Sequence, residues 1–306
     1  MRLYEISSRD SITQNCVALM TENASVLRFG HFYPIIGSAD TPRKIASATG
    51  GQFRAINDSY PTNQVAPVFG SVSLKIYGSK LEVDKAYERR GKDIPSERAR
   101  QLNNFMQELG KNFQYEFFNG KTSTNVKSFN GVRALVPSAQ IITADESGLL
   151  IPLGISDAAR TTQQKLLEKL RLLINKVNKP DTLFMNEEDH SRITTIAAEY
   201  IQYTKDDFGN YVPTFAGVPL IPAGYSADGT QVLPQNELFG EYNNASSIIA
   251  IKFGEEADLT MATSTGLVID DLGLVGNHYV YSVEMDADLA LLNNKALGML
   301  IGIVLE

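Results

Sequence analysis

Residues 95–120 of the chain read PSERARQLNNFMQELGKNFQYEFFNG. Apolar side chains recur here at helical spacing, at Leu102, Phe105, Met106, Leu109, Phe113 and Phe117. Pro95 and Glu97 suit the first turn of a helix, and Asn119-Gly120 is a stop signal. The pattern predicts one helix from Ser96 to Asn119, roughly 35 Å long, with a single apolar side. Gly110 interrupts this helix and indicates a bend or a close contact.

The residues before this helix, 52–90, alternate polar and apolar side chains. Val72, Leu74 and Ile76 fall on one face of the predicted strand, and the alternation resumes at Leu81-Glu82-Val83-Asp84. Gln52–Ile56 shows the same period of two, which predicts strands with one face covered. A two-stranded segment of this kind is too small to form a hydrophobic core of its own. It is either a hairpin that projects and packs on another subunit, or a surface β-meander of its own domain.

Residues 1–50 show no sustained period and contain Pro34 and Pro42 among small and polar residues. Such a segment is typical of an arm that lies on a neighbouring molecule, or of a frayed terminus. We therefore expect residues 1–50 to be weakly ordered.

The remainder of the chain mixes helical and strand patterns, which indicates an α+β fold. Asn130-Gly131 predicts a turn, followed by a short strand that ends before Pro137. Helices are predicted at about 159–178 and at about 186–203, the second with Asn186 as its N-cap and Tyr200 facing inward. Further strands are predicted at about 148–153, 183–185, 215–222, 246–253, 278–291 and 296–305. Because the last of these is fully apolar, it should be buried in a core that begins earlier in the chain.

The composition describes a folded chain without a membrane anchor. Its 306 residues are 43% hydrophobic and 21% charged, which suits one large domain or two ordinary ones. No run of about 18 apolar residues occurs, and the first residues lack the blocks of a secretory signal. Cys16 is the sole thiol, which excludes an internal disulfide and a cysteine–zinc cluster and suits a reducing cytosol. The net charge of −7 argues against a specific nucleic-acid binder, although the chain could enclose nucleic acid.

No motif for catalysis or for phosphate binding is present, so we predict no catalytic residue and no cofactor. The best metal candidate is Glu187 with His190, three residues apart on a predicted helix face. A di-metal bundle needs a second such pair, and the chain has none. We therefore interpret Glu187, Glu188 and Asp189 as acidic side chains that interact favourably with the positive end of the helix dipole, and we predict no metal site.

The other charged clusters are interpreted as solvated turns. These are Asp206-Asp207-Phe208-Gly209-Asn210, which lacks the spacing of a calcium loop, Glu255-Glu256, Asp270-Asp271, and the basic cluster Glu88-Arg89-Arg90-Gly91-Lys92. The basic cluster could also contact phosphate or an acidic neighbour.

The order of these elements resembles the Hong Kong 97-type capsid fold of tailed-bacteriophage major capsid proteins. The segments that carry the resemblance are the helix end Gln114–Gly120 followed by Phe129-Asn130-Gly131-Val132, the segment Thr214–Ile221, and the predicted strands Val280–Leu291 and Leu297–Val304. The resemblance covers about residues 50–306. It implies an N-terminal arm at 1–50, an extended hairpin loop at 51–92, a peripheral domain with the spine helix at 93–130 and 260–292, and an axial domain at 131–259 and 293–306.

The resemblance also implies a function, which is the structural subunit of an icosahedral phage head around double-stranded DNA, built from hexamers and pentamers. The partners would be further copies of the chain, a portal and, in some heads, a decoration protein. Some members of the family begin with a long helical scaffolding segment. This chain has no room for one, so we expect a separate scaffolding protein. The expected location is the virion, after synthesis in the cytoplasm of a bacterial host.

Two alternatives remain open. An encapsulin, a bacterial compartment with the same fold, would need a groove for cargo peptides, and a soluble enzyme would need a metal at Glu187 and His190. One prototype of the family cross-links its subunits through lysine and asparagine. Lys75, Lys80 and Lys85 lie in the corresponding region, but neither an asparagine partner nor a catalytic glutamate can be identified, and we predict no cross-link.

Overall fold

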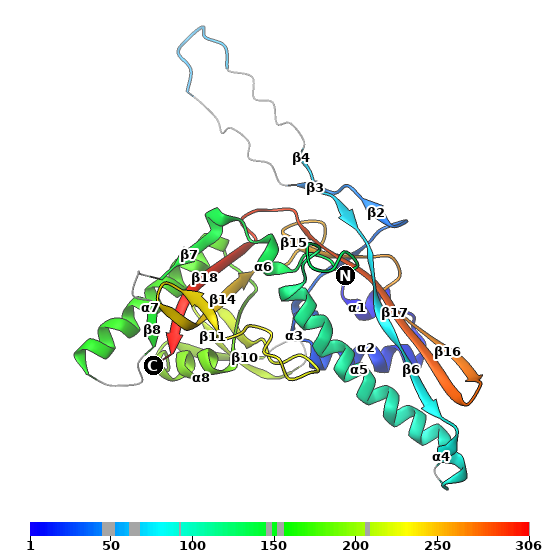
Figure 1. The fold of residues 1–306 in the computed structure, drawn as a ribbon. Coiled ribbons are helices and arrows are strands. Elements are labelled where there is room, and N and C mark those ends of the chain that lie inside the picture. The colour runs from blue at the N-terminus through cyan, green and yellow to red at the C-terminus, as the bar shows by residue number, and fades with distance from the viewer. Residues whose placement is uncertain are drawn as a thin grey trace.

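Two β-sheets organise the chain, and the helices pack against them (Figure 1). The computed structural model describes residues 1–44, 53–60, 68–91, 93–144, 149–151, 156–205 and 209–305. The smaller sheet contains β1 (Phe32–Pro34), β6 (Lys75–Asp84), β15 (Leu259–Thr263), β16 (Leu267–Val275) and β17 (His278–Leu291). Residues from both ends of the sequence therefore build one sheet.

β17 is the central strand of the smaller sheet. β6 pairs antiparallel along one side of it, from His278↔Asp84 to Ala287↔Lys75. β16 and β15 follow each other along the opposite side, and β1 extends the sheet by a parallel pairing with β15. The predicted strand at 278–291 is thus confirmed. It is the longest strand in the described part of the chain.

The predicted long helix is α5 (Ile94–Asn119), and it lies along the smaller sheet. The stripe residues Leu102, Met106, Leu109, Phe113 and Phe117 are buried, and Phe105 is partly buried. Pro95 stands in the first turn, and Gly120 follows the last, as expected from the sequence. The helix is therefore held by one apolar side.

The larger sheet has nine strands and is built mostly from the middle of the chain. Its strands are β7 (Ile141–Thr143), β8 (Leu149–Ile151), β9 (Thr182–Met185), β10 (Ile201–Lys205), β11 (Tyr211–Phe215), β12 (Val218–Pro222), β13 (Glu237–Phe239), β14 (Tyr242–Ile251) and β18 (Leu297–Leu305). Its apolar core includes residues of α7 (Asp157–Val177) and α8 (Glu187–Ile196). The apolar C-terminal strand β18 lies between β14 and the pair β7 and β8, which confirms its predicted burial.

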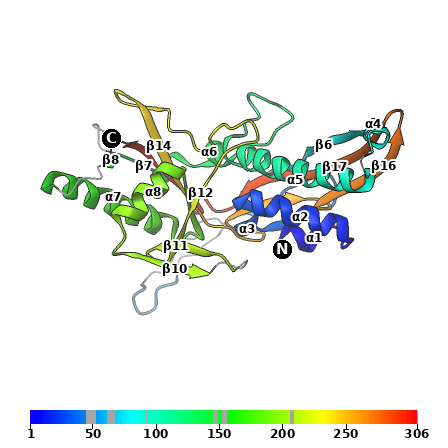
Figure 2. The same cartoon turned by 90° about the horizontal axis from the view of Figure 1, so that it is seen from below.

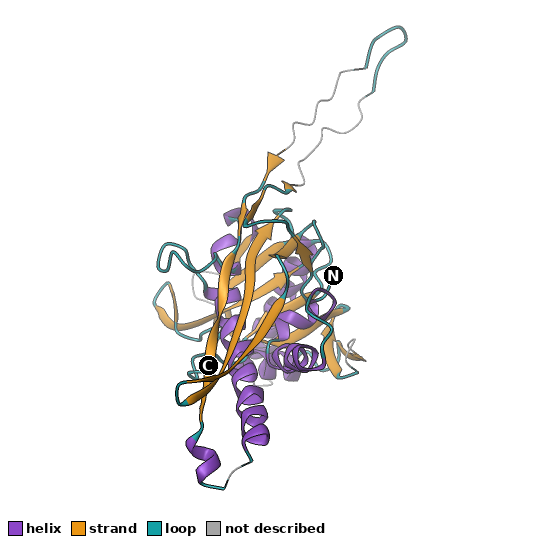
Figure 3. Cartoon of the chain, turned by 90° about the vertical axis from the view of Figure 1, so that its right-hand side faces the viewer, coloured by secondary structure: helices purple, strands orange, loops and turns teal. Residues whose placement is uncertain are grey.

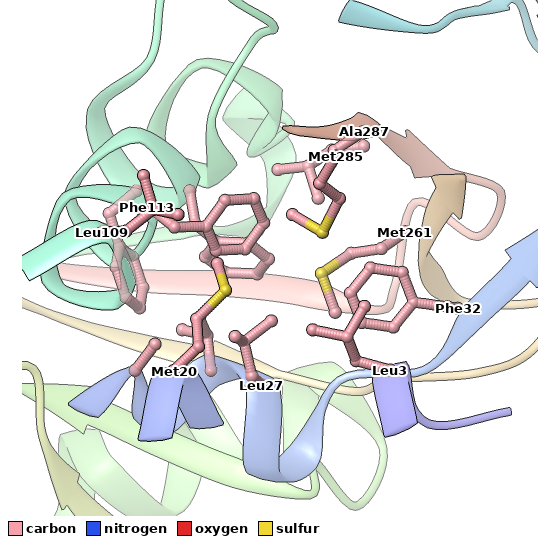
Figure 4. Close-up of a cluster of buried hydrophobic side chains, with 14 of the residues drawn as sticks. Leu3, Met20, Leu27, Phe32, Leu109, Phe113, Met261, Met285 and Ala287 are labelled. Atoms are coloured by element: carbon pink, nitrogen blue, oxygen red, sulfur yellow. The ribbon is translucent and has the colours of Figure 1, made fainter. Parts of the chain in front are cut away.

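The expectation of weak order is wrong for residues 1–34. They form α1 (Leu3–Ile6), α2 (Ser11–Asn23), α3 (Ser25–Phe29) and β1, and α2 packs beside α5 (Figure 2). Figure 4 shows side chains of this segment meeting α5 and the smaller sheet, among them Leu3, Met20, Leu27, Phe32, Leu109, Phe113, Met261 and Met285. Packing against a large apolar surface stabilises helices that are too short to persist alone.

The hairpin also differs from its predicted bounds. Its base is formed by β2 (Ala39–Asp40) with β5 (Val72–Ser73) and β3 (Arg43–Lys44) with β4 (Val68–Phe69), so it begins before residue 51. β6 belongs to the smaller sheet and not to the projection, because β17 offers it a ten-residue partner. Ile76 is exposed, since Tyr77, Leu81 and Val83 face the core instead. Gln52 lies outside the described residues, and residues 53–60 form loop and turn.

Three local predictions need correction. Residues 132–135 form the short helix α6 and not a strand, capped by the turn at Gly131. The second predicted helix ends at Ile196, because the chain enters β10 at Ile201 and leaves Tyr200 exposed. Asp270 and Asp271 lie within strand β16 and not in a turn. Asp206, Asp207 and Phe208 lie outside the described residues.

Candidate assembly surfaces

The base of the hairpin is fixed to the body of the chain by polar and apolar contacts. The Asp288 carboxylate on β17 accepts a hydrogen bond from the Ser73 N–H at 2.7 Å. Val72 is buried in a small apolar cluster with Tyr33, Ala262 and Leu292. The hairpin therefore leaves the smaller sheet from a defined anchor.

Residues 53–60 lie far from the rest of the described chain (Figure 3). Phe53, Ile56 and Tyr60 are 108%, 90% and 67% exposed, and Arg54 stacks over the Tyr60 ring at 5.0 Å. Apolar side chains exposed together on one loop form a candidate interaction surface. We call residues 53–60 the hairpin tip.

A second exposed apolar surface lies on β16. Val268, Leu272, Leu274 and Val275 are exposed, and β16 pairs with β17 alone among the described strands. An unpaired edge with apolar side chains is a template for further association. We call this surface the β16 edge.

Arg98 in the first turns of α5 fixes the helix to the strands beside the β16 edge. Its Nη2 donates to both carboxylate oxygens of Asp271 at 2.6 and 2.7 Å. Its guanidinium also lies over the rings of Tyr279 and Tyr281, 4.9 and 4.6 Å from their centres. Partial burial raises the pKa of Asp271, but the hydrogen bonds from Arg98 and from the Gly273 N–H outweigh it and lower that pKa.

Glu187 and His190 do not come together with further metal ligands. Glu187 is exposed in the first turn of α8, whereas His190 is partly buried and bonded to the backbone of Leu220. Burial lowers the pKa of His190. Within the described residues, no group of three histidine, cysteine or acidic side chains could hold a metal ion. The acidic residues instead follow the N-cap residue Asn186, whose Oδ1 accepts a hydrogen bond from the Glu188 N–H at 2.7 Å.

The predicted basic cluster and the three lysines considered for a cross-link lie on or near the surface. Glu88, Arg89, Arg90 and Gly91 are exposed around α4 (Ala86–Arg89), and Lys92 lies outside the described residues. Lys75 and Lys80 are on β6, and Lys85 follows it directly.

Sequence reasoning missed the anchoring roles of Arg98 and Asp288 and the burial of Asp189. The partners of Arg98 and Asp288 lie 173 and 215 residues away along the chain, so no local pattern reveals them. For Asp189, the signal is its position between Glu188 and His190, one turn before the buried Ile193. That spacing places Asp189 on the apolar face of α8.

Comparison with known proteins rests on structure alone. No protein-family model and no curated protein matches the chain. The SrpI encapsulin of Synechococcus elongatus PCC 7942 is similar with a TM-score of 0.63 and 14% identity, over 98% of this chain and 91% of that chain. A chain of Mycobacterium phage Bobi is similar at 0.56 and 14%, over 92% and 90%. The satellite phage P4 procapsid is similar at 0.53 and 10%, over 95% and 99%.

The chain has the Hong Kong 97-type capsid fold. This confirms the predicted α+β class and the resemblance to tailed-phage major capsid proteins. In this fold, α5 is the spine helix and the projection that ends in the hairpin tip is the extended loop. The described residues contain no helix that is long and apolar enough to cross a membrane.

Proposed function

We propose that the chain is the structural subunit of an icosahedral phage head that encloses double-stranded DNA. The observation that carries this proposal is the hairpin tip, whose apolar side chains project from an anchored base without cover from their own chain. On a neighbouring subunit the tip would bury this surface and gain free energy of about 25 cal/mol per Å². Contacts of this head-to-tail kind close into rings by rotation, which supports hexamers and pentamers.

The same proposal assigns the domains and the partners of the chain. Residues 93–130 and 260–292 act as the peripheral domain, and residues 131–259 and 293–306 as the axial domain, with the smaller and larger sheets as their respective cores. A separate scaffolding protein, a portal and, in some heads, a decoration protein are the proposed partners. Synthesis in a bacterial host and residence in the virion follow. The subunit does no catalysis, holds no metal and carries no cross-link.

Assembly of the full-length chain tests this proposal. The chain, expressed alone and with its genomic neighbours, should give closed shells by negative-stain electron microscopy. The double variant Phe53→Ser/Ile56→Ser should remain folded and unassembled. The matched control Ser59→Ala changes the same tip without removing an apolar side chain and should still assemble. Closed shells from the double variant, or a monomer under every condition for the unchanged chain, would overturn the proposal.

A second candidate is an encapsulin-type compartment. The observation that favours it is the TM-score of 0.63 with the SrpI encapsulin, against 0.53 to 0.56 for the phage, virus-like and transfer-agent particles. A groove of about 400 Å³ is present between α2, α5 and β17, lined by Ile12, Cys16, Leu102 and Tyr281 among others, where a cargo peptide could lie. Shells purified from the native source decide: packaged DNA and a portal support the phage head, whereas an enclosed enzyme supports the compartment.

A further inference from the structure

Polar side chains gather around a break in the larger sheet, and they include Asp189 in the first turn of α8. Asp189 is fully buried. Its Oδ2 accepts a hydrogen bond from Ser246 Oγ at 2.5 Å, and its Oδ1 has no hydrogen-bond partner in the described part of the chain. A buried carboxylate with one unpaired oxygen is costly when it is ionised.

Ser246 and the adjacent Ser247 stand at a break in the β14–β18 ladder. The register shifts between these two serines, and Gly302, in the part of β18 opposite them, has a φ of +86°. Ser246 Oγ also lies 3.3 Å from the carbonyl oxygen of Ile303. Because a hydroxyl has one hydrogen, Ser246 can donate either to Asp189 or to Ile303, but not fully to both.

Ser247 connects the break to a second carboxylate. Its Oγ donates to Glu237 Oε1 on β13 at 3.1 Å, and Glu237 forms an ion pair with Arg133 on α6. Arg133 Nη1 donates to Asn119 Oδ1 at 3.3 Å, at the last residue of the spine helix. Two hydrogen-bonded groups therefore flank the break. One joins Ser246 to Asp189, and the other leads from Ser247 through Glu237 and Arg133 to the end of α5.

The two carboxylates differ in charge compensation. Glu237 has the Arg133 guanidinium against it. Burial raises the pKa of Asp189 to about 6, and the charges of Glu188 and Glu237 act in the same direction. The Ser246 hydrogen bond and the charge of Arg192 on α8 oppose this rise without cancelling it. The pKa of the Asp189 carboxyl therefore lies well above its ordinary value of 3.8.

We propose that Asp189 is an acid-responsive latch on the break between β14 and β18. When Asp189 is protonated, it donates its hydrogen to Ser246 Oγ, which then donates to the Ile303 carbonyl and ties the two strands together. When Asp189 is ionised, it takes the Ser246 hydrogen for itself, and the strands lose that link beside an uncompensated buried charge. The latch acts within one subunit and is independent of the proposed assembly.

Hydrogen exchange read by mass spectrometry tests the latch in the full-length chain, held in one assembly state at pH 5.0 and pH 7.5. After correction for intrinsic exchange rates, peptides covering β14 and β18 should be up to about 10-fold less protected at pH 7.5. The limit is about 10-fold because a carboxyl of ordinary pKa 3.8 is already ionised in the opened state at pH 5.0, and the folded-state pKa of about 6 lies only about one pH unit higher. Peptides from β15 and β17 serve as the reference for global change. Equal protection of β14 and β18 at both pH values would overturn the proposal without any variant.

Two variants separate the latch from a general effect of pH. Asp189→Asn keeps the shape and can donate to Ser246 at every pH, so its β14 and β18 peptides should be equally protected at pH 5.0 and 7.5. Glu237→Gln makes the same chemical change in the paired carboxylate and should lower protection at both pH values while the pH dependence persists. An Asp189→Asn chain that keeps the full pH dependence would show that another group carries it.

Discussion

Gly110 of the spine helix lies directly against the backbone of Met20 in α2, so that a Cβ at residue 110 would stand 2.7 Å from the Met20 carbonyl oxygen. The interruption of the helical stripe by a glycine therefore marks a close crossing of two helices. This crossing joins the N-terminal segment to the core.

Gly110→Ala should destabilise the chain by about 1–2 kcal/mol, because the contacted atom is backbone and overpacking costs more than the ~1 kcal/mol gained in helix propensity. Urea unfolding followed by circular dichroism measures the change. Asn104→Ala on the exposed side of the same helix is the control, and it should lose no stability. A Gly110→Ala chain as stable as the unchanged one would mean that α2 shifts to admit the methyl group.

The spine helix and this close contact could be predicted from sequence because a strong period of 3.6 and a glycine are local signals. The N-terminal helix α2 was missed, although its buried positions Thr13, Cys16, Val17, Met20 and Thr21 follow helical spacing. Threonine and cysteine weaken that pattern, and α5, against which α2 packs, lies about 90 residues further along the chain, as the contact of Met20 with Gly110 shows. Partners this distant, including that of Asp288, are set by topology, which one sequence does not display.

The ion pair of Arg98 and Asp271 predicts a pH-dependent contribution to stability. Asp271→Asn should cost at most about 1 kcal/mol at pH 7, because the carboxylate is about half exposed and solvent screens the pair. The folded-state pKa of Asp271 is lowered, so its contribution is complete above the ordinary value of 3.8 and disappears as the pH falls through the lowered value. The difference between the two chains should therefore shrink below about pH 4.

Thermal unfolding at pH 7 and at pH 3 checks this difference. Asp270→Asn is the matched control, because Asp270 is the exposed neighbour on the same strand. It should leave the melting temperature unchanged at both pH values. A deficit of Asp271→Asn that is equal at pH 7 and pH 3 would rule out the ion pair as its source.

Tyr77 on β6 donates its hydroxyl to the Leu109 carbonyl of α5 at 2.8 Å, while its ring packs edge-on against Phe113 at 5.4 Å. Burial raises the pKa of Tyr77, so the hydroxyl stays protonated throughout the neutral range. Tyr77→Phe keeps the ring contact and removes the donor, which should cost about 1 kcal/mol in urea unfolding. Tyr87→Phe in α4, where the tyrosine is partly exposed, should cost less. Equal losses in the two variants would contradict a structural role for the Tyr77 hydroxyl.

Asp288 decides how firmly the hairpin is held, since its carboxylate accepts the Ser73 N–H at the hairpin base and the Leu289 N–H at its own strand. Asp288→Ala should leave both sheets folded and free the base, so that limited proteolysis within residues 68–73 becomes several-fold faster. Asp286→Ala is the matched control, because Asp286 lies two residues away on β17 and binds Ser264 instead of the hairpin. If cleavage at the hairpin base is equally fast in both variants, the Ser73 hydrogen bond is not the anchor, and the apolar cluster around Val72 holds the hairpin without it.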